Sequence, residues 1–154
     1  SNSIGVYTSL GDVLRSSGQF AEAAEAYSRA IKRVDEFQVE HWALFYTRGT
    51  TYERSDQWEL AEADFLRALE LEPDQPFVLN YLGYSWIEMG HNVEQATEMV
   101  VRAVDQRPTA GFIVDSLGWG YYKLGRYEDA ARQLERAVQL TPGDPTINDH
   151  LGDA

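Results

Sequence analysis

Residues 111–142 read GFIVDSLGWGYYKLGRYEDAARQLERAVQLTP, and this stretch decides the fold. Its first half places apolar side chains at Val114, Leu117 and Tyr121, the i, i+3, i+7 spacing of one helix face. The second half restarts the period after a glycine and stops at a proline; the residues are Gly125, Tyr127, Ala130, Leu134, Ala137 and Pro142. Because only a few residues separate the two predicted helices, we expect them to lie antiparallel as neighbours.

The same pattern recurs along the chain. Its marker glycines, which mostly follow a leucine, are spaced 38, 34, 35 and 34 residues apart: Gly11, Gly49, Gly83, Gly118 and Gly152. A helix pair of this length cannot bury its apolar face alone, so successive pairs must stack. The pattern predicts helices at 4–17, 20–34, 41–55, 58–72, 76–89, 93–107, 111–124, 127–140 and 145–153.

In its spacing, the stretch 111–142 resembles the tetratricopeptide repeat, with a first helix A and a second helix B. The resemblance implies an all-α fold, an alpha-alpha superhelix of right-handed sense built from antiparallel helix pairs. It also implies a single domain, 1–154, with repeats at about 4–37, 42–75, 76–110 and 111–144 and the start of a truncated fifth at 145–154. The function class implied is a non-catalytic scaffold for protein–protein interaction.

Departures from the pattern predict local irregularities. The first junction, around residues 35–41, is four residues longer than usual, and Asp35 stands where a closing proline is expected. Arg48 occupies a position where leucine is usual. We expect its guanidinium to snorkel to the surface or to pair with a carboxylate.

One stripe of each A helix should remain unburied and line a groove. The candidate peptide-binding residues on this stripe are Tyr46, Phe77, Asn80, Tyr84, Ile87, Phe112, Asp115, Trp119, Tyr122 and Asp149. Exposed aromatic rings suit a peptide, and the carboxylates favour a basic or amide-rich one. Two alternatives stay open: the aromatic rings fill space between adjacent A helices, and the acidic residues are solvated surface charges. The stripe offers Asn80 but no set of basic residues that matches the lysine, arginine and asparagine clamp of chaperone-binding members, which argues against a chaperone C-terminus as the ligand.

Composition narrows the partners further. Twenty-five acidic residues against thirteen basic ones give a net charge of -12, which repels the phosphate backbone of a nucleic acid. The same charge argues against the related helical repeats that bind RNA. No apolar run approaches the ~18 residues of a membrane span, and the chain has no cysteine.

Groups for catalysis or metal binding are poorly placed. His41, His91 and His150 fall in a linker, a turn and the last helix, so we interpret each as a lone surface histidine. Asp64, with neighbouring glutamates, is interpreted as part of a solvated acidic helix surface. We therefore expect no enzyme activity, no cofactor and no metal site.

A second function is a structural or self-assembling segment of a larger protein. Residues 145–154 begin a repeat and stop within its first helix, so the preceding repeat presents a face built to receive a neighbour. This predicts a possible homo-oligomer through the truncated C-terminal repeat. More weakly, repeats three to five resemble the C-terminal arrays of long bacterial tetratricopeptide proteins. That resemblance implies a bacterial adaptor and leaves the compartment open between cytoplasm and periplasm or cell envelope.

Overall fold

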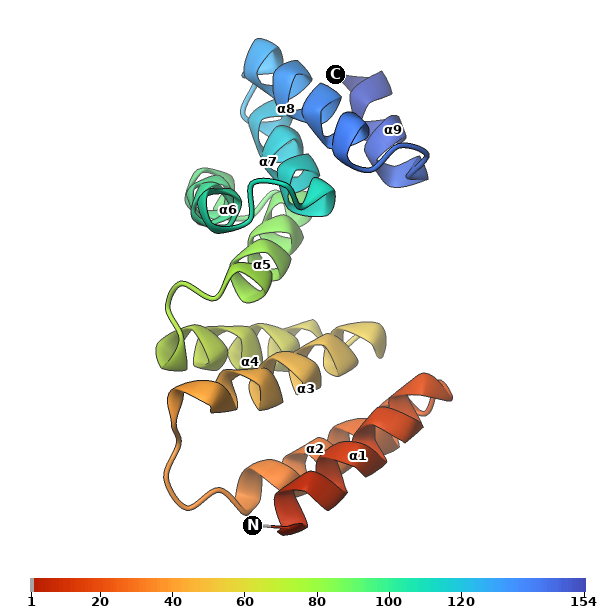
Figure 1. The fold of residues 1–154 in the computed structure, drawn as a ribbon, viewed down its shortest axis with the longest axis vertical. Helices are drawn as coiled ribbons and strands as arrows, with labels where there is room; N and C mark the ends of the chain where they lie inside the picture. The colour runs from red at the N-terminus through yellow and green to blue at the C-terminus, as the bar shows by residue number, and fades with distance from the viewer. Residues whose placement is uncertain (1) are drawn as a thin grey trace. The chain divides into compact units, whose positions relative to one another are not determined.

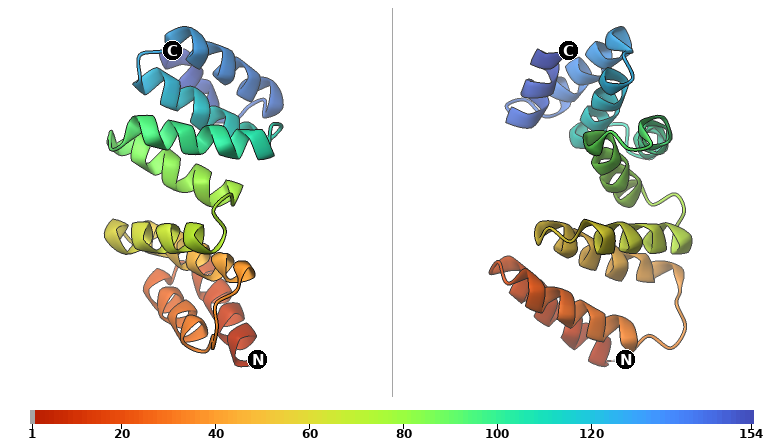
Figure 2. Two further views of the ribbon diagram at one scale, coloured as in Figure 1. Left: turned by 90° about the vertical axis from the view of Figure 1, so that its left-hand side faces the viewer. Right: turned by 180° about the vertical axis from the view of Figure 1, so that it is seen from behind.

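The structure is a computed structural model that describes residues 2–154. Over this range it contains nine α-helices, one short 3-10 helix and no strand. The helices form two compact units, one ending at Pro73 and the other running from Asp74 to Ala154. Within each unit the helices are packed in pairs (Figures 1 and 2). The predicted all-helical architecture is confirmed, whereas the single domain and its repeat boundaries stay predictions.

The first unit contains two helix pairs. Its elements are α1 (Asn2–Ser16), α2 (Phe20–Lys32), η1 (Val39–His41), α3 (Trp42–Arg54) and α4 (Trp58–Leu71). Helix α1 packs against α2, α3 packs against α4, and the two pairs meet where α2 contacts α3. The long connection after α2 extends away from the helices in Figure 1 and contains η1. There the Gln38 backbone N–H donates to His41 Nδ1 at 2.8 Å, so the predicted irregular junction has a structure of its own.

The second unit contains two helix pairs and a further helix. Its elements are α5 (Pro76–Met89), α6 (Val93–Gln106), α7 (Gly111–Lys123), α8 (Tyr127–Leu140) and α9 (Pro145–Asp153). Helix α7 packs against α5, α6 and α8, and α9 packs against α7 and α8. At the start of α9 the Asp144 carboxylate accepts the Ile147 backbone N–H at 3.1 Å, a side-chain N-cap that satisfies an otherwise free donor. All predicted helix boundaries lie within two residues of those observed.

Two glycines show why the repeat pattern requires them. Gly125 adopts φ 78° in the turn between α7 and α8, a left-handed conformation that glycine reaches without strain. A Cβ atom at Gly118 would lie 2.7 Å from the Leu134 side chain. Helices α7 and α8 therefore approach too closely for a larger residue, and Leu134 fills the contact with no exposed surface.

Arg48 pairs with a carboxylate, as the sequence predicts. Its Nε and Nη2 atoms donate to the two carboxylate oxygens of Asp64 at 2.8 and 2.7 Å, and Nη1 donates to Ser28 Oγ at 3.1 Å. The prediction that Asp64 is a solvated surface charge is wrong, because its side chain is only 6% exposed. Asp64 is one of the buried residues of α4, and its contact with Arg48 is part of a network that joins α2, α3 and α4.

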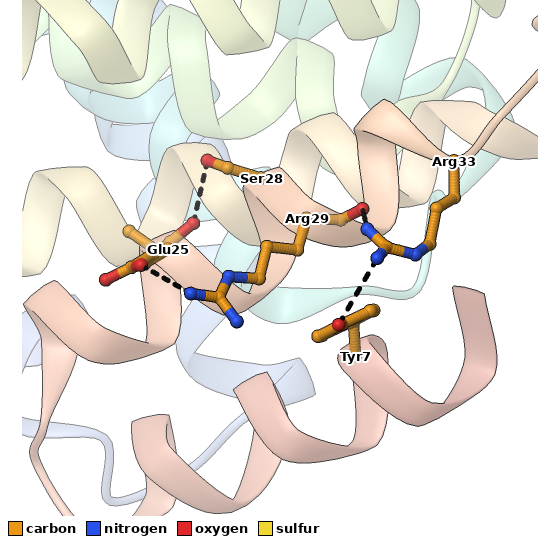
Figure 3. A network of polar contacts seen from close by, with 6 residues as sticks. Tyr7, Glu25, Ser28, Arg29 and Arg33 are labelled. Atoms are coloured by element: carbon orange, nitrogen blue, oxygen red, sulfur yellow. Dashed lines mark hydrogen bonds and ion pairs between the residues drawn. The ribbon is translucent and has the colours of Figure 1, made fainter. Parts of the chain in front are cut away.

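A second polar network lies on the outside of the first helix pair (Figure 3). The guanidinium of Arg33 stacks 4.3 Å above the Tyr7 ring and donates to its hydroxyl at 3.3 Å. Arg33 also donates to the Arg29 carbonyl oxygen, and Arg29 pairs with Glu25 at 3.0 Å. These exposed contacts tie α1 to α2 beside their apolar interface.

Candidate protein-binding site

The predicted groove residues differ widely in exposure. Phe112 and Asp149 are exposed, and Tyr46, Phe77, Tyr84 and Tyr122 are half-buried. The expectation of an open stripe is wrong for four others, each at most 8% exposed: Asn80, Ile87, Asp115 and Trp119. The prediction uses only the angular position of each residue around its own helix, and it does not account for the neighbouring helices that cover these four. Ile87 is a core residue without exposed surface.

Helix α9 contributes to a stack of three aromatic rings. The Trp119 indole lies 4.9 Å from the Tyr122 ring at 14° and 4.1 Å from the His150 imidazole at 15°. Lys123 Nζ also lies 5.1 Å from the indole centroid. The tryptophan therefore packs in an internal aromatic cluster, as the alternative of space filling between A helices predicts.

His150 is a buried member of this cluster. It is 7% exposed, and its Nδ1 lies 2.8 and 3.0 Å from the two carboxylate oxygens of Asp115. An ionised carboxylate only accepts hydrogen bonds, so Nδ1–H is the donor. The prediction of a lone surface histidine is wrong here, and Asp115 is not a solvated surface charge.

The repeat register alone does not predict this burial. His150 immediately precedes Leu151-Gly152, just as Ser116 precedes Leu117-Gly118. Ser116 is 3% exposed, but the corresponding Ser9 is exposed and Tyr81 is half-buried. The burial of His150 follows instead from its contacts with Asp115 and Trp119 on α7.

Tyr84 and Asn80 lie one turn apart on α5 beside the cluster. The Tyr84 ring lies 6.2 Å from the His150 ring. Burial, followed by the charge and hydrogen bond of Glu88 and the charge of Asp115, raises the pKa of Tyr84. Two buried polar atoms lack a hydrogen-bond partner in this part of the molecule, Asn80 Oδ1 and Trp119 Nε1.

An aromatic pair lies near the N-terminal ends of α5 and α7, where the predicted groove residues are more exposed. Phe77 on α5 and Phe112 on α7 lie with ring centroids 6.3 Å apart and planes 6° apart. Phe112 is 51% exposed, and the Arg107 guanidinium lies 5.5 Å from the Phe77 ring centroid. Phe77, Asn80 and Tyr84 share one face of α5 because their i, i+3, i+7 spacing follows the helical period.

Tyr46 is the candidate in the first unit. Its ring contacts Trp42 at 5.8 Å and Phe65 at 6.1 Å, within α3 and α4. Burial raises the pKa of Tyr46, and the positive charge of Arg15 opposes that increase. Its participation in one groove with the residues of the second unit stays a prediction.

Among residues 2–154, no group of three or more histidine, cysteine, aspartate or glutamate side chains is arranged to hold a metal ion. None of the helices in this range has the length and apolar character needed to cross a membrane.

Comparison with protein families gives matches in both units. Tetratricopeptide repeat models match residues 8–76 and residues 115–144. A TPR repeat-containing protein of Pseudomonas aeruginosa is 30% identical over 150 residues, which cover 97% of this chain and 25% of the relative. The chain thus spans about a quarter of the length of that relative.

Solved structures give the same fold at low sequence identity. MamA from Desulfovibrio magneticus aligns with TM-score 0.86 and 17% identity, covering 99% of this chain and 84% of that one. YrrB, described as a TPR protein with an unusual peptide-binding site, aligns with TM-score 0.77 and 22% identity, covering 100% and 77%. PilF of Pseudomonas aeruginosa aligns with TM-score 0.81 and 18% identity, covering 99% and 67%. These are superhelical repeat proteins, so the predicted fold class is confirmed.

Proposed function

Because the chain belongs to the tetratricopeptide repeat family, we propose that it is a non-catalytic scaffold that binds a peptide segment of another protein on α5 and α7. Repeat arrays of this kind generally hold other proteins, and their members typically lack catalytic activity. The proposed contact surface consists of Phe77 and Tyr84 on α5 and Phe112 on α7.

The aromatic pair of Phe77 and Phe112 carries the proposal. The two ring centroids lie 6.3 Å apart with planes 6° apart, and Phe112 is 51% exposed. Exposed aromatic rings supply a large contact area to a peptide at little cost in side-chain entropy. Asn80 Oδ1 is buried beneath this surface and is not part of the exposed contact.

The available charges favour a basic partner. The Asp115 carboxylate is buried against His150, so it is not accessible to a partner on this surface. Glu88 on α5 and Asp149 on α9 are both exposed and remain accessible to a partner. They would attract lysine or arginine flanking the apolar part of the peptide.

Phe112→Ala should reduce partner binding by roughly tenfold or more without unfolding the chain, because a half-exposed aromatic anchor contributes more to a contact than to the core. The partner would first be captured with a photoreactive amino acid at position 112 and identified by mass spectrometry. Its affinity for each variant would then be measured by calorimetry.

The matched control is Met89→Ala, which removes a similarly exposed apolar side chain at the far end of α5. It should bind the partner as the unsubstituted chain does. Equal affinities of the Phe112 and Met89 variants would rule out this surface as the binding site.

A self-assembling segment is the second candidate, and an apolar face on α1 favours it. Val6, Leu10 and Val13 are 63%, 46% and 67% exposed and lie on one helix face. The corresponding residues of α7 are buried against neighbouring helices; they are Ile113, Leu117 and Gly120. A face of this composition is normally covered in a repeat array.

Val13→Glu should shift the protein toward monomer if this face joins two copies, because a carboxylate buried there would lack a partner. Gln95→Glu adds the same charge at an exposed position of α6 and should change nothing. Sedimentation velocity over a wide concentration range measures the fractions of monomer and oligomer. A concentration-independent monomer of the unsubstituted chain would exclude assembly through α1.

A further inference from the structure

Asp115 and Trp119 enclose the imidazole of His150 on two sides. The two carboxylate oxygens of Asp115 lie 2.8 and 3.0 Å from Nδ1. The indole covers a ring face at 4.1 Å and 15°. The Tyr84 ring approaches at 6.2 Å with a tilt of 46°. We refer to Asp115, Trp119 and Tyr84 as the socket.

The chemistry of the socket selects for a flat group that carries N–H donors and positive charge. A buried carboxylate requires a donor or a counter-charge, because an isolated buried ion is strongly destabilising. An aromatic face binds a cation and also stacks on a planar one. Imidazolium and guanidinium combine both properties, whereas an ammonium group cannot stack.

The surrounding charges favour a cation as well. Burial is the largest cause of the raised pKa of Tyr84. The negative charges of Glu88 on α5 and Asp115 on α7 raise it further. On α9 itself, Asp149 and Asp153 are exposed carboxylates. Lys123, beside the indole of Trp119, is the opposing positive charge from α7.

We propose that the socket is a recognition site for a planar side chain with N–H donors, filled in this structure by His150 and open to a partner's arginine or protonated histidine when α9 is displaced. The part that concerns a partner rests on the proposed function. Helix α9 holds its place through two buried side chains, Ile147 and His150, among the residues described. A partner side chain and His150 of α9 would then compete for the Asp115 carboxylate, so only one of them can occupy the socket at a time.

The test uses imidazole and methylguanidinium as probes, at a pH where both are protonated. His150→Ala in the 154-residue chain leaves the carboxylate and the indole face without their occupant. This variant should bind either probe about tenfold or more tightly than the unsubstituted chain does, as measured by calorimetry and by the shift of the Trp119 indole N–H resonance. Asn148→Ala, a change at an exposed and uncharged neighbour on α9, should bind like the unsubstituted chain.

Adding Asp115→Asn to the His150 variant should weaken binding roughly tenfold or more, because the charged acceptor is lost. If probe affinity is the same with and without this change, or if His150→Ala binds no better than the unsubstituted chain, the socket assignment is overturned. Far-UV circular dichroism would verify that α1 to α8 remain folded in both variants.

Ile147→Ala tests displacement without altering the socket. It removes the other buried anchor of α9, so His150 should vacate the socket more often and probe affinity should rise above that of the unsubstituted chain. Unchanged affinity would overturn the exchange of occupants. The titrations contain no partner protein, so their failure is separate from failure of the proposed function, which the Phe112 variant tests.

Discussion

Asp64→Ala is expected to lower the free energy of unfolding by about 3–5 kcal/mol, the usual cost of removing one partner from a buried ion pair. The Arg48 side chain is 19% exposed, and its guanidinium makes two hydrogen bonds to this carboxylate. Burial acts to lower the pKa of Arg48, and the hydrogen bonds and charge of Asp64 outweigh it, so the pKa is raised. Without Asp64 the guanidinium remains charged and keeps only Ser28 as a polar partner from this network.

Urea unfolding followed by circular dichroism would measure the loss, with Glu59→Ala as the matched control. Glu59 is an exposed carboxylate on the same helix, and its removal should change stability by less than about 0.5 kcal/mol. The double change Arg48→Leu with Asp64→Met should recover most of the loss, because it replaces the pair by apolar side chains. A loss below about 1 kcal/mol for Asp64→Ala would show that solvent reaches Arg48 and that the pair is not a buried one.

The Arg48 pair illustrates what the sequence predicts and what it omits. A charged residue on an apolar helix face requires a counter-charge, so pairing could be predicted from the repeat pattern alone. The partner could not be chosen by charge, since α4 offers several carboxylates. Its repeat position resolves the choice: Asp64 corresponds to Gln133 in the next-but-one repeat and directly precedes the core residue Phe65.

The candidate site shows a different limit. Helical phase correctly places Val114 and Leu117 in the core, but neighbouring helices bury every residue of α7 from Ile113 to Gly120, which phase alone does not show. Asp115 and Trp119 are buried because α9 supplies His150 between them, a contact over 35 residues of chain. Phe112, one turn nearer the start of α7, remains half-exposed, so only part of the predicted stripe is accessible.

Leu134→Ala is expected to lower the free energy of unfolding by about 2–5 kcal/mol, the range for deleting a fully buried leucine side chain. Leu134 has no exposed surface and lies against Gly118, whose missing Cβ leaves the space that the leucine fills. With alanine at position 134 of α8 and glycine at position 118 of α7, the two helix backbones must move closer to each other or a cavity remains between them. Glycine has no side chain with which to fill it, so partial collapse is the only relief available.

Leu140→Ala, on the same helix but 36% exposed, is the matched control and should cost clearly less. If both variants lost the same free energy of unfolding, the contacts at the C-terminal end of α8 would stabilise it as much as the contact between Leu134 and Gly118 does. The binding experiment separates the core from the surface. Under conditions where the Leu134 variant remains folded, it should retain more partner affinity than Phe112→Ala, because Leu134 supports α7 from behind while Phe112 belongs to the proposed contact surface.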